Sequence, residues 1–258
     1  MTGRRFALAV SLTVATGCAS ARPAREPLVS DRPDFTEAPE TMAPREVQLE
    51  GGYTFARTAR ERTHTTGEIL TRIGLVPRAE LRIEPGSYST LSSPVGDTRG
   101  VEDAALGVKL RLHDAPDAGR SLVPALSVVL LTSVPTGSRV LRQSAMQPEA
   151  KLVTAWTLTD RLAFAANINV ARPVEDRRRF TEWAGSASLG ITLTERYGTY
   201  VEIFGFEPQL GGAATTKYAN TGLTAALTPD FQLDVRAGVG FNRTGPDYFV
   251  GAGFARRW

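Results

Sequence analysis

The C-terminal stretch, residues 230–258, alternates between apolar and polar side chains over two long runs. The apolar members of the first run are Phe231, Leu233, Val235, Ala237, Val239 and Phe241. Successive side chains of a β-strand point to opposite faces, so this period of two predicts a strand with one wholly apolar face. Soluble strands usually end after about five or six residues, whereas a tilted strand needs about ten to cross a bilayer. The stretch therefore predicts a membrane-crossing hairpin, with Trp258 at the lipid–water interface.

Similar segments follow one another along the chain, and we count about twelve of them, an even number as in single-chain bacterial barrels. They are residues 46–57, 68–75, 78–84, 101–113, 122–134, 147–158, 161–171, 182–195, 197–206, 217–228, 230–242 and 247–257. Their connections alternate between long and short, as in outer-membrane barrels with long external loops and short periplasmic turns. The predicted fold class is therefore all-β: a single closed antiparallel transmembrane β-barrel, an up-and-down meander of about 12 strands, over residues 46–258.

The polar faces of these segments carry charged side chains, often several per strand. An Arg or Lys facing lipid near the midplane would cost roughly 2–4 kcal/mol, so we expect the charges to face the lumen. We predict a cationic wall opposite an acidic wall along a solute pathway. The cationic residues are Arg72, Arg78, Arg82, Lys109, Arg111 and Arg236, and the acidic residues are Glu50, Glu80, Asp103, Glu202 and Asp234. In the alternative interpretation, these charges pair with one another and rigidify a barrel that does not conduct.

The N-terminal part of the chain divides into two regions. Arg4 and Arg5 precede an apolar run, which predicts a secretory signal peptide over residues 1–21. The single cysteine, Cys18, ends a sequence that resembles a lipobox, so it is a candidate for lipidation; ordinary cleavage after residues 19–21 is the alternative. Residues 22–45 are rich in Pro, Arg and Glu and show no periodicity. They predict either a periplasmic extension or a plug in the barrel, in which Arg32, Asp34 and Glu37 pair with lumen charges.

Several function classes lack support in the sequence. The net charge is only +3, and no basic cluster is interleaved with aromatic residues, so nucleic-acid binding is not expected. Two histidines are too few for a histidine-based metal site, and His64 and His113 fall at opposite ends of the predicted barrel. Neither histidine has a serine and a carboxylate nearby on one strand face, so we expect no enzyme. There is no Gly-rich phosphate loop, and no cofactor is expected.

Several motifs resemble those of one bacterial family, and they extend over nearly all of the chain after the signal peptide. They are residues 30–37 (SDRPDFTE), 47–53 (VQLEGGY), 100–103 (GVED), 135–137 (PTG), 200–206 (YVEIFGF) and 233–240 (LDVRAGVG). The family is that of transporter barrels named for the MetA pathway of phenol degradation. This resemblance implies an outer-membrane β-barrel that passes small organic molecules, aromatic ones included.

We therefore expect a channel for small organic solutes in the bacterial outer membrane. The expected partners are outer-membrane lipid, lipopolysaccharide, the barrel assembly machinery and the solutes themselves. One alternative is a structural or assembly barrel with a blocked lumen, anchored as a lipoprotein. A further alternative is a secreted soluble barrel that binds lipid inside an apolar interior.

Overall fold

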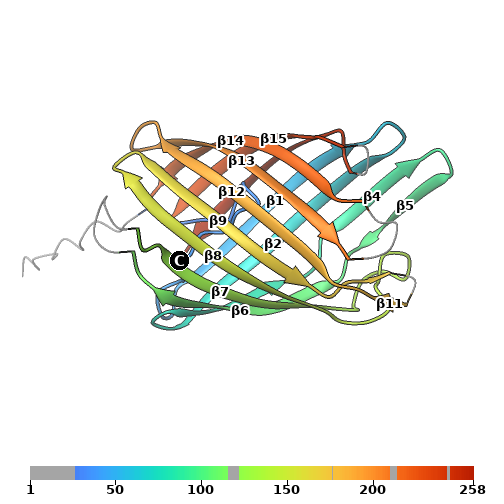
Figure 1. Ribbon diagram of the computed structural model, residues 1–258, viewed down its shortest axis with the longest axis horizontal. Coiled ribbons are helices and arrows are strands. Elements are labelled where there is room, and N and C mark those ends of the chain that lie inside the picture. The colour runs from blue at the N-terminus through green and yellow to red at the C-terminus, as the bar shows by residue number, and fades with distance from the viewer. Residues whose placement is uncertain (1–26, 116–121, 176, 210–213, 243–244) are drawn as a thin grey trace, which may run out of the picture.

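The computed structural model describes residues 27–115, 122–175, 177–209, 214–242 and 245–258 and shows one closed barrel (Figure 1). The predicted signal peptide and Cys18 lie outside the described residues. The strands of the barrel are β1 (Val47–Arg57), β2 (Arg62–Val76), β3 (Ala79–Glu84), β6 (Ala104–His113), β7 (Ala125–Val134), β8 (Gln147–Thr159), β9 (Leu162–Ala171), β12 (Glu182–Thr192), β13 (Tyr197–Pro208), β14 (Thr216–Thr228), β15 (Phe231–Gly240) and β16 (Tyr248–Arg257).

Each of these strands pairs antiparallel with the next along the chain, and the ring closes because β1 pairs with both β2 and β16. The closing pair runs from Gln48 opposite Arg257 to Arg57 opposite Tyr248. Closure leaves none of these strands with an unpaired edge, which is a requirement for a sheet in lipid. The predicted twelve-strand meander is therefore confirmed.

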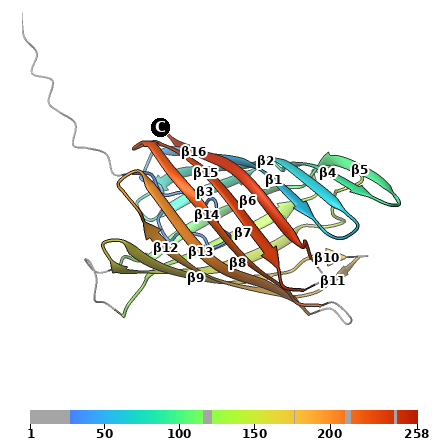
Figure 2. The same ribbon diagram turned by 90° about the horizontal axis from the view of Figure 1, so that it is seen from above.

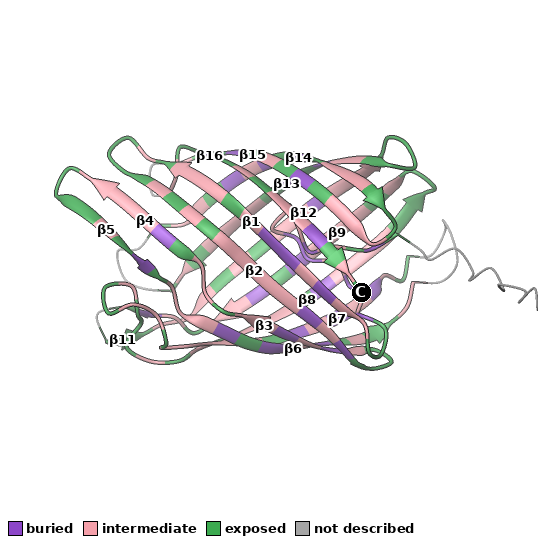
Figure 3. Cartoon of the chain, turned by 180° about the vertical axis from the view of Figure 1, so that it is seen from behind, coloured by how far each residue is buried: buried purple, intermediate pink, exposed green. Residues whose placement is uncertain are grey.

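The faces of the strands have the predicted orientation. On β15, Leu233 and Val235 are 41% and 51% exposed, whereas Asp234 between them is 3% exposed. The same alternation runs along the other strands (Figure 3). Apolar side chains thus point outward and charged ones inward, which excludes the soluble barrel with an apolar interior.

Two strand pairs were not predicted from the sequence. Residues 85–100 were expected to be a loop, yet they contain nearly all of the hairpin β4 (Tyr88–Ser93) and β5 (Gly96–Val101). This hairpin pairs with the first part of β2, which begins at Arg62, earlier than its apolar pattern indicated. A short hairpin, β10 (Val174–Glu175) and β11 (Arg178–Arg179), lies at the same end of the barrel (Figure 2).

The two ends of the barrel differ in their connections. One end, here called the short-turn end, carries the tight turns β2–β3, β8–β9 and β14–β15 together with the C-terminus (Figure 1). The other, the long-loop end, carries both small hairpins. Outer-membrane barrels place short turns in the periplasm, so we expect the short-turn end to face the periplasm. No described helix is long and apolar enough to cross a membrane.

Residues 27–46, here called the lumen segment, precede β1 and lie inside the barrel. Prolines at positions 33, 39 and 44 keep this segment from continuing a sheet, since proline has no N–H to donate to a ladder. Leu28 N–H bonds to the carbonyl of Pro229 at the short-turn end. From there the segment contacts side chains on β2, β3, β6, β8, β13 and β15, which lie on all sides of the lumen.

Candidate functional site

A buried charge network lies where β1, β2 and β3 face the lumen. Arg72 Nε and Nη2 donate to the two carboxylate oxygens of Glu80 over 2.9 and 3.0 Å. Arg72 also lies 3.3 Å from a carboxylate oxygen of Glu50, and Glu80 accepts from Arg82 over 3.1 Å. Glu50 and Glu80 have no exposed surface. Unpaired charges at such depth would be costly, so these residues must be considered as one unit.

Two carboxylates of the lumen segment complete this network. Asp31 accepts from Arg82 over 2.6 Å and from Lys109 over 3.0 Å. Glu37 accepts from Lys151 on β8 over 2.7 Å and lies 3.3 Å from Arg82. The segment therefore supplies the counter-charges for cations on β3, β6 and β8. The predicted opposition of a cationic and an acidic wall is corrected here, because both signs alternate on neighbouring strands.

The environment of these carboxylates shifts their pKa values. Burial alone would raise the pKa of Asp31, but Arg72, Lys109 and Arg82 together hold it well below its usual range. Burial likewise opposes ionisation of Glu37, and Arg82 and Lys151 overcome it and lower its pKa to about 2. Both side chains therefore stay ionised at neutral pH and hold the segment against the wall.

A second set of ion pairs holds the segment on the opposite side. Arg32 donates to Glu68 on β2 over 2.9 Å and to Asp234 on β15 over 3.4 Å. A side chain at Gly52 or Gly253 would overlap the guanidinium, since an added Cβ would lie 2.3 or 2.4 Å from it. Arg236 donates to the carbonyl of Pro33 over 3.0 Å. The bare backbone of β1 and β16 thus makes room for Arg32.

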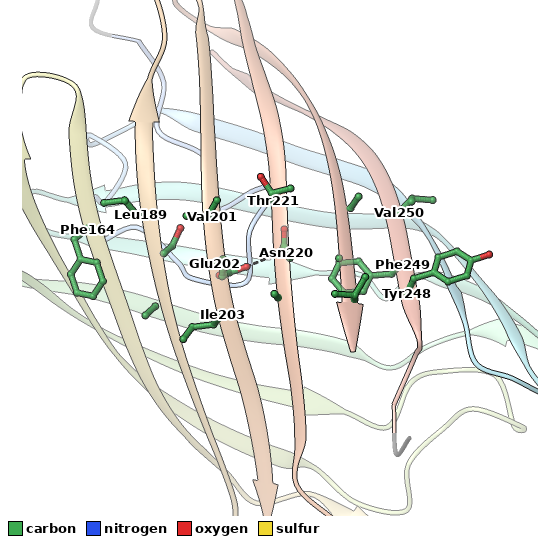
Figure 4. Close-up of a pocket in the computed structure, with 16 residues that line it drawn as sticks. Phe164, Leu189, Val201, Glu202, Ile203, Asn220, Thr221, Tyr248, Phe249 and Val250 are labelled. Atoms are coloured by element: carbon green, nitrogen blue, oxygen red, sulfur yellow. Dashed lines mark hydrogen bonds between the residues drawn. The ribbon is translucent and has the colours of Figure 1, made fainter. Parts of the chain in front are cut away.

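Glu202 on β13 binds the backbone of the segment. Its carboxylate accepts from the N–H groups of Phe35 and Thr36 over 3.0 and 2.6 Å, and from the Thr36 hydroxyl over 2.6 Å. Asn220 on β14 donates to Glu202 over 2.6 Å, while Tyr200 donates to Asn220 over 2.6 Å. Figure 4 shows Glu202 and Asn220 joined across neighbouring strands. No cation pairs with Glu202 among the described residues.

On the outer face of the same strands, small side chains leave a shallow apolar hollow of about 770 Å³ (Figure 4). Ala187, Ala219 and Ala237 form its floor, and larger residues such as Val201 and Ile203 form its sides. This hollow faces the surrounding lipid rather than the lumen.

Asp34 differs from the other carboxylates of the segment, because no cation within the described part of the chain pairs with it. Its Oδ2 accepts from the Ser188 hydroxyl over 3.2 Å. Burial raises the pKa of Asp34 well above its usual range, and the negative charge of Glu202 raises it further. Asp34 is therefore ready to accept a proton or another positively charged group.

Aromatic rings form a cluster between the segment and β13, β14 and β16. Phe35 stacks on Phe204 with ring centroids 4.8 Å apart, and Phe204 stacks on Tyr218 at 4.9 Å. Phe206 and Phe249 meet these rings edge-on or tilted. Offset and edge-to-face pairs of this kind are favourable and leave faces that another ring can stack on. We call these five residues the aromatic cluster.

A cavity of about 560 Å³, here called the short-turn cavity, separates the segment from the walls of β8, β9 and β12–β14. Asp34, Ser188 and Tyr200 line one side of it. Inward-facing alanines, Ala125, Ala155, Ala163 and Ala165, line the other side. Short side chains on these strands leave space that longer ones would fill.

Two predicted lumen residues lie elsewhere. Arg78 is in the β2–β3 turn and pairs with Asp114 at the exposed rim. Asp103 accepts from the N–H groups of Gly137 and Gln143 and so organises loops at the long-loop end. Both flank strand ends, where a period-two pattern no longer tells the inside from the outside. Arg111 also pairs with Asp114, over 2.6 Å, beside the mouth of the short-turn cavity.

Sequence reasoning missed Asp31, Glu68, Lys151 and the aromatic cluster as members of the site. Lys151 alternates with apolar neighbours on β8 and could have been found from that pattern. Phe35 lies in a segment without periodicity, so no local signal shows its stacking on Phe204. Among the described residues, no group of three or more metal-binding side chains is close enough to hold an ion.

Comparison with known sequences places the chain in a family. The sequence pattern described as "Putative MetA-pathway of phenol degradation" matches residues 30–258. The chain belongs to this family. The match begins at residue 30, within the lumen segment, so most of this segment belongs to the part of the chain that the family pattern covers. No curated protein sequence matches the chain.

Solved structures with a similar fold are outer-membrane proteins. The COG4313 outer membrane channel from Pseudomonas putida F1 superposes with a TM-score of 0.65 at 15% identity, covering 88% of this chain and 99% of that one. The NanC porin superposes with a TM-score of 0.55 at 10% identity, covering 81% and 98%. The KdgM porin in complex with disordered oligogalacturonate gives 0.51 at 10% identity, covering 82% and 98%. This member of the MetA-pathway family is thus an outer-membrane β-barrel of the bacterial cell.

Proposed function

We propose that the barrel is an outer-membrane channel for small organic solutes, aromatic ones included. The observation that carries the proposal is a lumen with two kinds of surface around one segment. Charged side chains line β1–β3 and β6, and the aromatic cluster lines β13, β14 and β16. A solute with a ring and a polar group could use both surfaces, and a cavity of about 560 Å³ leaves space for it at the short-turn end.

The lumen segment sets the width of the path in this proposal. It crosses the interior and is tied to both sides, by Asp31 and Glu37 on one and by Arg32 on the other. Solutes would pass beside the segment or after part of it has moved. The outer-membrane lipid around the barrel, lipopolysaccharide in the outer leaflet and the barrel assembly machinery are the partners we propose for it. We also propose that the protein has no catalytic activity.

Conductance in planar bilayers tests the channel directly. We expect discrete current steps in potassium chloride from the purified protein, and swelling of loaded liposomes in solutions of small aromatic acids and amines. Heat-denatured protein from the same preparation is the control for detergent artefacts. Absence of both current and swelling would reject the proposal.

A non-conducting structural barrel is the second candidate, and the buried charge network favours it. The segment is fixed by several ion pairs with little exposed surface, as expected for a permanent plug. The variant Asp31→Asn, Glu37→Gln separates the two candidates. A channel conducts already with the native segment and conducts more when the ties are removed, whereas a structural barrel conducts in the variant alone.

A further inference from the structure

We propose that the short-turn cavity is a binding site for a small organic ammonium ion, with Asp34 as the carboxylate that accepts its N–H groups. This inference names the solute class for the proposed channel and so rests on that function. The cavity holds about 560 Å³ and opens at the short-turn end. Its position beside the lumen segment puts a bound solute on the periplasmic half of the path.

The charge of the ligand follows from what surrounds Asp34. Its carboxylate has one side-chain hydrogen bond, from Ser188, and no cation pairs with it in the described residues. The charge that raises its pKa most is the negative charge of Glu202, whereas Asp31 is paired with Arg82 and Lys109 and adds less. A carboxylate among carboxylates favours a positively charged partner, because each nearby negative charge adds to the attraction.

The cations that line the cavity do not offset this field. Arg32 is paired with Glu68 and Asp234, and Arg111 is paired with Asp114. Arg161 lies in the exposed β8–β9 turn at the mouth of the cavity. The inner part of the cavity, next to Asp34, therefore attracts cations.

The wall that extends from Asp34 along the sheet defines the rest of the ligand. Ser188, which holds Asp34, pairs in register with Ala165 on β9, which pairs with Ala155 on β8 and then with Ala125 on β7. These positions form one row across the sheet, with neighbouring strands about 4.8 Å apart. A ligand whose ammonium group reaches Asp34 would lay an apolar body along the alanines. The structure thus fits an amphipathic amine, such as an aromatic or short alkyl amine.

Protonation supplies a further expectation. Since burial and Glu202 raise the pKa of Asp34, a proton competes with a bound cation at higher pH than it would at an ordinary carboxylate. An ammonium ion must displace that proton, so its affinity rises with pH until Asp34 is fully ionised. The groups around Asp34 are Ser188, Glu202, Asp31 and Tyr200, together with Arg236 on β15, whose guanidinium donates to the carbonyl of the preceding residue, Pro33.

Isothermal titration of the full-length protein in detergent with benzylamine, benzoate and benzyl alcohol tests the site. We expect benzylamine to bind more tightly than the other two compounds. Asp34→Asn should lower the affinity for benzylamine by roughly tenfold or more. Hydrogen exchange of residues 27–46 in the variant shows whether the segment has stayed in place. The proposal would be overturned if benzoate bound as tightly as benzylamine. It would also be overturned if Asp34→Asn bound benzylamine with undiminished affinity while the segment stayed in place.

A second variant approaches the site from the other wall. Ala155→Leu fills part of the cavity without touching the segment's ion pairs, and it should also lower the affinity for benzylamine. Ala150→Leu, on the lipid-facing side of β8 and outside the cavity lining, is the matched control and should bind as the wild type does. Equal affinity in Ala155→Leu and Ala150→Leu contradicts the site even if Asp34→Asn releases the segment. A barrel that conducts salt but does not prefer benzylamine disproves this inference alone, whereas absence of conductance counts against the proposed function.

Discussion

Arg82 donates a hydrogen bond to Asp31 over 2.6 Å, and this contact joins β3 to the segment that crosses the lumen. The same carboxylate also accepts from Lys109, so one residue of the segment serves cations on two strands. Side chains of all three residues are almost fully buried. Removing one partner of such a set leaves the others as uncompensated charges, which typically costs about 3–5 kcal/mol.

Asp31→Asn should therefore loosen the lumen segment. We expect larger single-channel conductance in planar bilayers and faster hydrogen exchange over residues 27–46. Asp114→Asn is the control, because it breaks exposed ion pairs with Arg78 and Arg111 that are each worth about 0–1 kcal/mol. Wild-type conductance and exchange in Asp31→Asn would show that the segment is held by other contacts.

The attachment of the segment should weaken in acid. The pKa of Glu37 is lowered from 4.5 to about 2, so its stabilising contribution is complete above pH 4.5 and is lost as the pH falls toward 2. We expect the protection factors of residues 27–46, which are exchange rates corrected for the intrinsic pH dependence of amide exchange, to fall across that window. Glu37→Gln should already have low protection factors in this segment at neutral pH, without the further fall in acid that protonation of Glu37 causes. Identical pH profiles for the two proteins would contradict the assignment.

Gly238 is needed for the position of Phe249. A Cβ at this glycine would lie 2.1 Å from Cζ of the Phe249 ring, so Gly238→Ala must displace a member of the aromatic cluster. Overpacking of this kind usually costs about 1–3 kcal/mol, which urea unfolding in lipid vesicles would detect. In Gly185→Ala the new atom has no neighbour nearer than 3.9 Å, so we expect little change. Equal stability of the two variants would disprove this explanation.

A charged side chain on the outward face of β15 should destabilise the barrel. Val235 is 51% exposed on the lipid-facing wall, and Val235→Arg should reduce the free energy of folding into vesicles by roughly 2–4 kcal/mol. Gln232→Arg places the same side chain on the inner face of the same strand, next to the short-turn cavity, and should be tolerated. A smaller penalty at position 235 than at position 232 would mean that the inner and outer faces had been exchanged.

The barrel could be predicted from the sequence because its pattern is local. Alternation at Leu233, Asp234 and Val235 reports which side faces lipid, whatever the rest of the chain does. Strand ends were less certain. The polar residues from Arg62 to Gly67 read as a loop, yet they extend β2 because β4 pairs with them above the membrane-spanning part. A polar strand outside the lipid has no apolar face, so its sequence lacks the alternation by which a strand is recognised.

The interior of the barrel could be predicted only in part. Inward charges such as Arg72 and Glu80 follow from alternation, but which residues they pair with depends on the register between strands. The lumen segment has no period, so its sequence allowed both a linker and a plug. Its place inside the barrel is fixed by contacts more than a hundred residues apart, such as Glu37 with Lys151, and short-range patterns cannot reveal these.

Because Asp31 and Glu37 belong to the segment and not to the wall, they would leave together with it. Arg82, Lys109 and Lys151 would then remain with only the wall carboxylates to neutralise them. The vacated pore would be more positive on that side and would favour anions. The ion selectivity of the pore thus depends on whether the lumen segment is in place, so a shift in reversal potential would report the position of the segment.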